Sequence, residues 1–288
     1  PAPLLARSVQ VSHDGMRYVF SLRDDVRFHN GALLTADDVV WSWRRYLDPR
    51  SNWTCLSDFD GSRGSRIESV TATDTHTVVF RLDAPSPMLL TQMAALPCGG
   101  SGIVHRDSLN PDGSWNAPIG TGPYRLLEWK RGQYIDLAAF PAYASRGGAR
   151  DGYTGGKIAY AGKLRWLIIR DDASRRAALI KGQVDVMPEV IVSDIDQVRK
   201  LSGIALDISP GMAASALLIQ SNDALLSDPL LRRALAHSLD IATIAELATG
   251  GTGVANASMV PVASPYYSAT QKQGYSADPA LARRLLAQ

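Results

Sequence analysis

The sequence predicts an α/β fold of two lobes, and three observations support this prediction. Short runs of alternating apolar and polar residues, joined by turn residues, are typical of paired strands. Apolar residues spaced three and four apart, preceded by Thr, Asp or Pro, indicate amphipathic helices. The length of 288 residues is sufficient for two lobes of ordinary size. We therefore expect mixed sheets with flanking helices.

Two hairpins are expected in the first third of the chain. Residues 9–12 and 16–22 alternate in polarity on either side of the turn His13-Asp14-Gly15. Residues 67–73 and 77–82 flank a second turn in the same way. These four runs predict paired strands that belong to one mixed lobe.

Two helices are expected in the same lobe as these hairpins. Thr35 is the predicted N-cap of the first helix, which has acidic residues in its first turn and ends at Asp48-Pro49. Ser86-Pro87 begins the second helix, whose apolar residues continue to Leu96.

Residues 118–124, Pro-Ile-Gly-Thr-Gly-Pro-Tyr, form a predicted joint between two rigid parts. Proline restricts some backbone angles of this segment, and glycine leaves others free. The alternation of Tyr124, Leu126 and Trp129 that follows is typical of a strand that leaves a tight turn.

The second half combines strand and helix patterns. A buried strand over 164–169, a helix over 175–181 and a strand over 184–187 together suggest a βαβ unit in a partly parallel sheet. Residues 144–162 are rich in Gly and Ser and predict a surface loop or an insertion. Further elements are predicted as strands over 204–208 and 213–220 and as helices that begin at Asp228-Pro229 and Asp278-Pro279.

Composition and motifs argue against nucleic-acid binding and against catalysis. Thirty basic and 28 acidic residues give a net charge of +2, and the two signs are interspersed. The five histidines show no metal-binding spacing, so we expect no metal and no cofactor. Ile103 replaces the last glycine of a nucleophile elbow that would begin at Gly99, so we expect no enzyme.

The two cysteines, Cys55 and Cys98, are too far apart for a redox CxxC pair and too few for a structural zinc site. A single disulfide and two buried free thiols both remain open, because the spacing alone does not decide between them.

Five blocks carry a resemblance to a known family. The chain resembles the extracellular solute-binding proteins of family 5, the dipeptide- and oligopeptide-binding receptors of ABC importers. The blocks follow one another in the order of the family and comprise residues 18–31, 34–42, 118–124, 182–186 and 228–240.

The resemblance implies a two-lobed, periplasmic-binding-protein-like fold of type II. Family members are roughly twice as long, so the chain is expected to be truncated at both ends. By resemblance, residues 1–117 correspond to the extra mixed α/β domain of the first lobe and residues 118–218 to its central sheet. Residues 219–288 then correspond to the incomplete beginning of the second lobe.

The resemblance also implies ligand-binding positions. They are Trp53, Gly120, Thr121, Gly122, Glu189, Met212 and Ala214. For several of them a structural role is the alternative: the glycines shape a turn, Glu189 is a solvated loop carboxylate, and Trp53 belongs to a core. The chain also departs from the family pattern, since Ala144 stands where an aromatic residue is usual and Gln220 where Asn is usual.

The implied function is a receptor without catalytic activity that captures a peptide between two lobes for a membrane permease of an ABC importer. Alternatives are a non-peptide solute (a nickel chelate, an opine or a sugar) and a ligand-sensing module of a regulator. We expect a monomer in the periplasm or outside the cell, and anchoring to the membrane as a lipoprotein is a further option. Such an oxidising compartment favours the Cys55–Cys98 disulfide.

Overall fold

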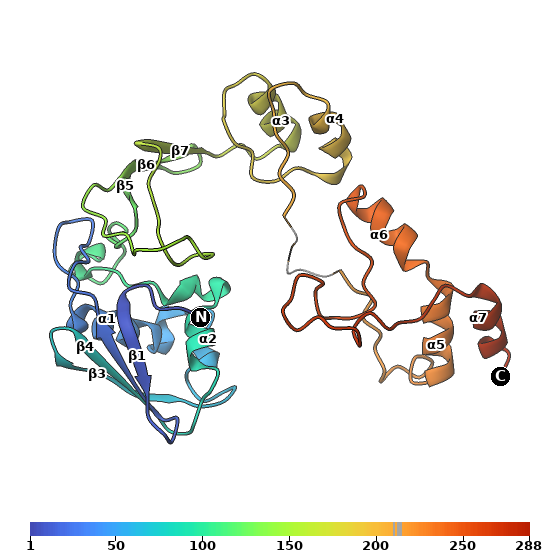
Figure 1. Ribbon diagram of the computed structural model, residues 1–288, viewed down its shortest axis with the longest axis horizontal. Coiled ribbons are helices and arrows are strands. Elements are labelled where there is room, and N and C mark those ends of the chain that lie inside the picture. The colour runs from blue at the N-terminus through green and yellow to red at the C-terminus, as the bar shows by residue number, and fades with distance from the viewer. Residues whose placement is uncertain (210, 212–214) are drawn as a thin grey trace. The chain divides into compact units, whose positions relative to one another are not determined.

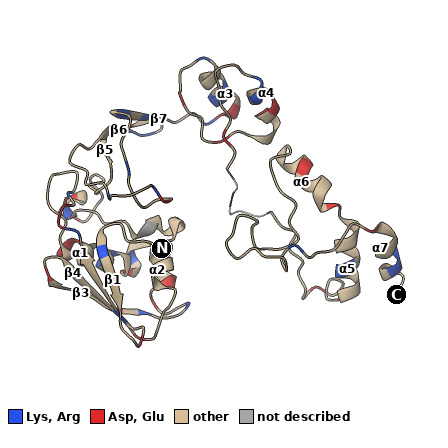
Figure 2. Ribbon diagram, viewed as in Figure 1, with Lys and Arg blue, Asp and Glu red and all other residues tan. Residues whose placement is uncertain are grey.

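The chain divides into two units, Pro1–Ile169 and Arg170–Gln288. The computed structural model describes residues 1–209, 211 and 215–288 (Figure 1). The observed boundary coincides with neither of the boundaries expected after residues 117 and 218, and the division into three parts stays a prediction. Basic and acidic residues are interspersed along both units (Figure 2).

The first unit contains an antiparallel sheet of four strands in the order β1-β2-β4-β3. Both predicted hairpins are confirmed, because β1 pairs with β2 and β3 pairs with β4. The pairing places alternate residues such as Tyr18 and Phe80 opposite each other on the buried face. The strands are β1 (Ala6–Val11), β2 (Arg17–Leu22), β3 (Ile67–Asp74) and β4 (Thr77–Leu82).

The predicted first helix is confirmed as α1 (Ala36–Tyr46), which packs against β3 and β4. The backbone N–H and the hydroxyl of Thr35 both donate to Oδ2 of Asp38, at 2.9 and 2.7 Å, which fixes the start of the helix. Val40 and Trp43 are buried against the sheet and form the centre of the main hydrophobic core.

The predicted second helix is shorter than expected. Helix α2 (Leu89–Met93) ends before Leu96, and a 3-10 helix follows at Leu96–Ser101. Pro97 lacks a backbone N–H and disfavours α conformation in the residue before it, so the α-helix cannot continue. Three more 3-10 turns lie in this part of the unit, at Pro49–Ser51, Leu56–Asp58 and Arg106–Ser108.

A second sheet follows the joint at residues 118–124. Strands β5 (Tyr124–Lys130), β6 (Tyr134–Ala139) and β7 (Lys163–Leu167) pair in that order, and all pairs are antiparallel. The prediction of a buried strand in a parallel βαβ unit was therefore wrong for β7, although the position of the strand was correct. Between β6 and β7, residues 144–162 contain no helix or strand, which confirms the predicted loop.

The described part of the second unit consists of helices and loops. The predicted helices at 175–181, after Asp228 and after Asp278 are confirmed. The helices are α3 (Asp172–Ile180), α4 (Ile195–Arg199), α5 (Pro229–Ser238), α6 (Ile241–Thr249) and α7 (Pro279–Leu286), with a 3-10 turn at Val192–Asp194.

The strands predicted at 184–187, 204–208 and 213–220 are wrong where these residues are described. A β-strand is stable only when a neighbouring strand accepts and donates its backbone hydrogen bonds. The described residues 170–209, 211 and 215–288 contain no strand to act as that neighbour, so the apolar patterns remain extended loops.

A small core joins two helices of the second unit. Ala234 of α5 and Ala282 and Leu285 of α7 are buried against each other. Asp228 and Asp278 cap these helices by accepting hydrogen bonds from backbone N–H groups of the first turn. None of the helices in the described residues is both long and apolar enough to cross a membrane.

Candidate functional site

One histidine, His29, makes three hydrogen bonds to the joint at residues 118–124. The backbone N–H of His29 donates to the Gly120 carbonyl at 2.9 Å, and the N–H of Gly120 donates to Nδ1 of His29 at 3.3 Å. Because Nδ1 accepts a hydrogen bond, the ring proton lies on Nε2, which donates to the Gly122 carbonyl at 3.1 Å. The neutral ring therefore connects the turn after β2 to both glycines of the joint.

The same joint is also tied to the end of β6. The ring of His29 lies edge-on to Phe140, with centroids 5.2 Å apart, and the N–H of Phe140 donates to the Pro123 carbonyl at 2.8 Å. Burial lowers the pKa of His29 below its ordinary value of 6.5, and hydrogen bonds to backbone carbonyl groups oppose this shift. The joint thus depends on an uncharged His29.

Acidification should weaken the first unit through His29. A lowered pKa in the folded state means that the unfolded chain binds the proton more tightly, so the contribution of His29 to stability is present above pH 6.5 and is lost as the pH falls through the folded pKa. One proton sets a limit of about 1.4 kcal/mol per pH unit. Urea unfolding between about pH 7 and pH 5 should show a smaller loss of stability in His29→Gln than in the wild type.

The exposed His13 offers the matched control for this measurement. His13→Gln should lose as much stability on acidification as the wild type, because His13 lies in the exposed turn between β1 and β2. An equal acid-dependent loss in His29→Gln and in the wild type would contradict the prediction.

The two glycines of the joint are not required by the local backbone. Neither Gly120 nor Gly122 has a positive φ. A Cβ atom on Gly120 would meet Cε1 of His29 at 3.7 Å, and one on Gly122 would meet the Tyr124 carbonyl at 3.9 Å, which are ordinary contacts. The alternative that these glycines only shape a turn therefore finds no support in their conformation.

A small cavity of about 50 Å³ lies beside the joint within the first unit. Leu4, Leu5 and Val26 form part of its wall, and the joint contributes Thr121, Gly122 and Pro123. Tyr143 and Ala144, together with Arg23 and Lys157, complete the lining. Two of the predicted ligand-binding residues, Thr121 and Gly122, thus lie together at one cavity.

The guanidinium of Arg23 is fixed at this cavity. It donates to both carboxylate oxygens of Asp25 at 2.9 Å and to the Ala144 carbonyl at 2.8 Å. The Arg23 guanidinium lowers the pKa of Asp25. Because Arg23 is only 8% exposed, this bidentate pair also keeps its buried charge satisfied.

Gly120 and Trp53 of the first unit are not among the residues that line this cavity. Glu189 is exposed in the second unit. Trp53 is half-buried and stacks on Phe59 with centroids 5.3 Å apart, so it contributes to the core of the first unit. Met212 and Ala214 lie outside the described residues. Their ligand-binding roles, like that of Trp53, stay predictions.

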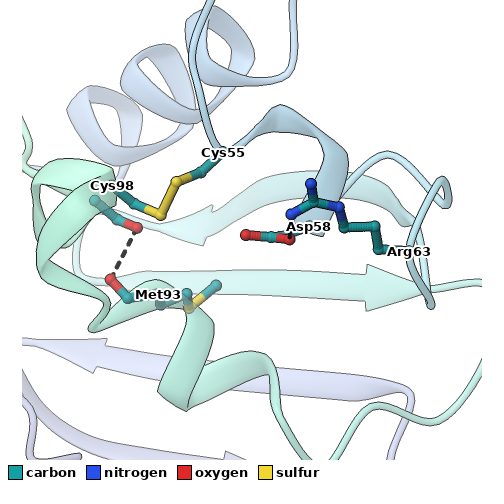
Figure 3. Close-up of a disulfide and its surroundings, with 6 residues drawn as sticks. Cys55, Asp58, Arg63, Met93 and Cys98 are labelled. Atoms are coloured by element: carbon teal, nitrogen blue, oxygen red, sulfur yellow. Dashed lines mark hydrogen bonds and ion pairs between the residues drawn. A yellow bond between two sulfur atoms is a disulfide. The ribbon is translucent and has the colours of Figure 1, made fainter. Parts of the chain in front are cut away.

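Cys55 and Cys98 are joined in a disulfide in the first unit (Figure 3). Both residues are buried in the main hydrophobic core, with their Cα atoms 5.6 Å apart. Asp58 lies nearby, but the two sulfur atoms are bonded to each other and cannot act as thiolate ligands of a metal. Asp58 instead pairs with Arg63 at 3.2 Å.

Most residues of the site were not predicted from the sequence, and those with ionisable side chains among them are His29, Arg23, Tyr143 and Lys157. Arg23 and His29 lie in the block at residues 18–31. This block indicated the family but did not show which of its side chains belong to the site. Lys157 belongs to a loop without periodicity, and no local pattern places it against a cavity formed by the start of the chain and the joint. Such contacts depend on tertiary structure.

Comparisons with known proteins agree with the resemblance. The family model described as bacterial extracellular solute-binding proteins, family 5 Middle, matches residues 1–288. The peptide transport periplasmic protein SapA of Salmonella typhimurium is 29% identical over 92% of this chain and 49% of its own length. The dipeptide-binding protein of Escherichia coli is 29% identical over 99% of this chain and 54% of its own length. The chain thus spans about half the length of these relatives.

A solved structure is also similar. The PBP AgaA of A. tumefaciens R10, in complex with agropinic acid, is 27% identical and has a TM-score of 0.71, covering 99% of this chain and 55% of its own. This likeness, together with the sheets and helices of the chain, confirms the predicted fold class.

Proposed function

Because the chain belongs to the bacterial extracellular solute-binding proteins of family 5, we propose that it is part of a receptor that captures a peptide for an ABC importer. The relatives named above as a peptide transport protein and a dipeptide-binding protein support a peptide as the ligand. We place this receptor in the periplasm or outside the cell, where a membrane permease receives the ligand. The family is one of solute-binding receptors, so the proposal includes no catalytic step.

The observation that supports this proposal at the level of residues is the pair of glycines in the joint. Gly120 and Gly122 do not need the conformational freedom of glycine, and Thr121 and Gly122 line a cavity. A backbone without side chains permits a close approach of a ligand, and main-chain hydrogen bonds suit an extended peptide. In this proposal, closure of two lobes buries the ligand beside the joint.

A thermal-shift screen tests the proposal on the protein expressed from its full coding sequence. Dipeptides and oligopeptides should raise the melting temperature, because a ligand at a hundredfold its dissociation constant adds about 2.7 kcal/mol of stability. The solved structure that contains agropinic acid favours a second candidate, a non-peptide solute, so opines, sugars and metal chelates form the other arm. Stabilisation by one of these solutes and by no peptide would overturn the peptide assignment.

Gly122→Ala tests the role of the joint. The folded state should be as stable as the wild type or up to about 1 kcal/mol more stable, because alanine reduces the entropy of the unfolded chain. Ligand binding should weaken about tenfold or more, since a methyl group at a close contact costs about 1–3 kcal/mol. Calorimetry with the ligand from the screen, together with urea unfolding, measures both effects.

Gly31→Ala provides the contrasting control. Gly31 has a φ of 91° and open space around it, so alanine should strain the backbone there and lower stability by about 1 kcal/mol. If Gly122→Ala were the more destabilising change, or if it bound the ligand with unchanged affinity, Gly122 would have a structural role only.

A further inference from the structure

Lys157 is a half-buried cation at the cavity beside the joint, and it has no ion-pair partner among the described residues. Its backbone N–H donates to Oγ of Ser145 at 2.9 Å, which anchors this part of the loop beside the cavity wall. Lys163 shows the contrast, because its ammonium group pairs with Asp136 at 3.0 Å. A charged side chain that is partly withdrawn from water and has no anion beside it is a feature that an anionic ligand can satisfy.

The other charges near Lys157 do not neutralise it. Arg23, which lines the same cavity, is already bonded to both oxygens of Asp25. Burial lowers the pKa of Lys157, and the positive charge of Arg150 acts in the same direction. The cavity therefore combines one compensated ion pair with one uncompensated positive charge.

The size and lining of the cavity restrict what can enter. A volume of about 50 Å³ accommodates a few water-sized groups, on the order of four, which matches a carboxylate and excludes a whole peptide. Leu4, Val26 and Pro123 supply apolar walls, whereas Thr121 supplies a hydroxyl group. Ala144, whose side chain is a single methyl group, lies at the cavity and leaves it open.

We propose that Lys157 and the cavity it lines form a subsite for a carboxylate group of the ligand. The ammonium group donates charge-assisted hydrogen bonds to the carboxylate, and the apolar walls accept the carbon atom that carries it. The identity of the ligand as a peptide rests on the proposed function, whereas the anion subsite itself does not. The carboxylate comes either from an acidic side chain or from the C-terminus of a peptide.

Protection of Lys157 from reductive methylation tests the subsite without any peptide. The protein, expressed from its full coding sequence, is methylated in acetate and in chloride at equal ionic strength. Peptide mass spectrometry then measures the extent of methylation at each lysine. Acetate at ten times its dissociation constant should slow methylation of Lys157 about tenfold, because about nine tenths of the sites are occupied. Lys163, exposed and paired with Asp136, is the internal control.

The proposal is overturned if acetate leaves the methylation rate of Lys157 unchanged. It is also overturned if chloride protects Lys157 equally, because the effect is then screening of charge by salt and not binding of a carboxylate. Either result leaves the peptide screen unaffected. Conversely, acetate protection without any peptide binding supports the subsite and overturns only the proposed peptide function.

Peptide variants distinguish the two sources of the carboxylate. Replacing Glu by Gln in a bound peptide removes the side-chain carboxylate, and C-terminal amidation removes the terminal one. One of these changes should weaken binding about tenfold or more in the wild type and have no effect in Lys157→Met. Lys130→Met, which removes an exposed lysine of β5, should still bind the peptide that has the carboxylate more tightly than the one that lacks it. The proposal is overturned if loss of the carboxylate weakens peptide binding as much in Lys157→Met as in the wild type.

Discussion

Trp43→Ala should lower the free energy of unfolding of the first unit by about 3–5 kcal/mol, the range typical of a buried tryptophan. Trp43 is only 3% exposed. Its ring makes edge contacts with Phe59 at 5.3 Å and with Phe80 at 5.1 Å, so it joins α1 to the sheet and to the segment that carries Cys55. Removal of the ring leaves a cavity that these neighbours cannot fill.

Trp115→Ala is the matched control for this prediction. Trp115 is 49% exposed, so the same chemical change should alter stability by no more than about 0.5 kcal/mol. Urea unfolding followed by far-ultraviolet circular dichroism measures both variants without depending on tryptophan fluorescence. Losses of similar size at the two positions would contradict the assignment of Trp43 to the centre of the core.

Replacing both Cys55 and Cys98 by alanine should lower the free energy of unfolding by about 4 kcal/mol. The disulfide spans a sequence separation of 43 residues, and it therefore restricts the unfolded chain over a long loop. It also joins the 3-10 turn that follows α2 to the loop that follows α1, two segments without a long helix or strand of their own (Figure 3). The expected effect is on stability and not on how strands β1, β2, β3 and β4 pair with one another.

Reduction provides the control for the disulfide prediction. Dithiothreitol should destabilise the wild type to the level of the double alanine variant and should leave that variant unchanged. Thiol labelling of the denatured, unreduced protein should find no free thiol. Two labelled cysteines, or a double variant as stable as the wild type, would show that the bond does not stabilise this unit.

Local patterns were sufficient to predict the hairpins and the capped helices. Residues 6–22 and 67–82 form hairpins because turn residues and alternation agree over a short span. Asp228 and Asp278 begin helices because their carboxylates accept from N–H groups only two or three residues away. Thr35 begins a helix because its N–H and hydroxyl both donate to Asp38, three residues away. The information for these elements is contained in a few consecutive residues.

Patterns that depend on a distant partner gave wrong or incomplete predictions. Residues 184–187 have a strand-like sequence, but no neighbouring strand in the described part of the second unit pairs with them. Residues 163–167 do form a strand, yet its antiparallel direction follows from β6 and not from its own residues. The cavity is a stronger example, because it brings Leu4, Thr121 and Lys157 together from three separate segments.

By itself, the sequence determined the class of the protein: the family, the α/β fold, the hairpins and most helices, and the position of the joint at residues 118–124. Only the tertiary structure decided how that joint is held by His29, that Cys55 and Cys98 are bonded, and that Lys157 lacks an ion-pair partner among the described residues. The reason is physical. Turns, caps and periodicity act over a few residues, whereas a hydrogen bond across 91 residues or a charge beside a cavity exists only once distant segments have packed.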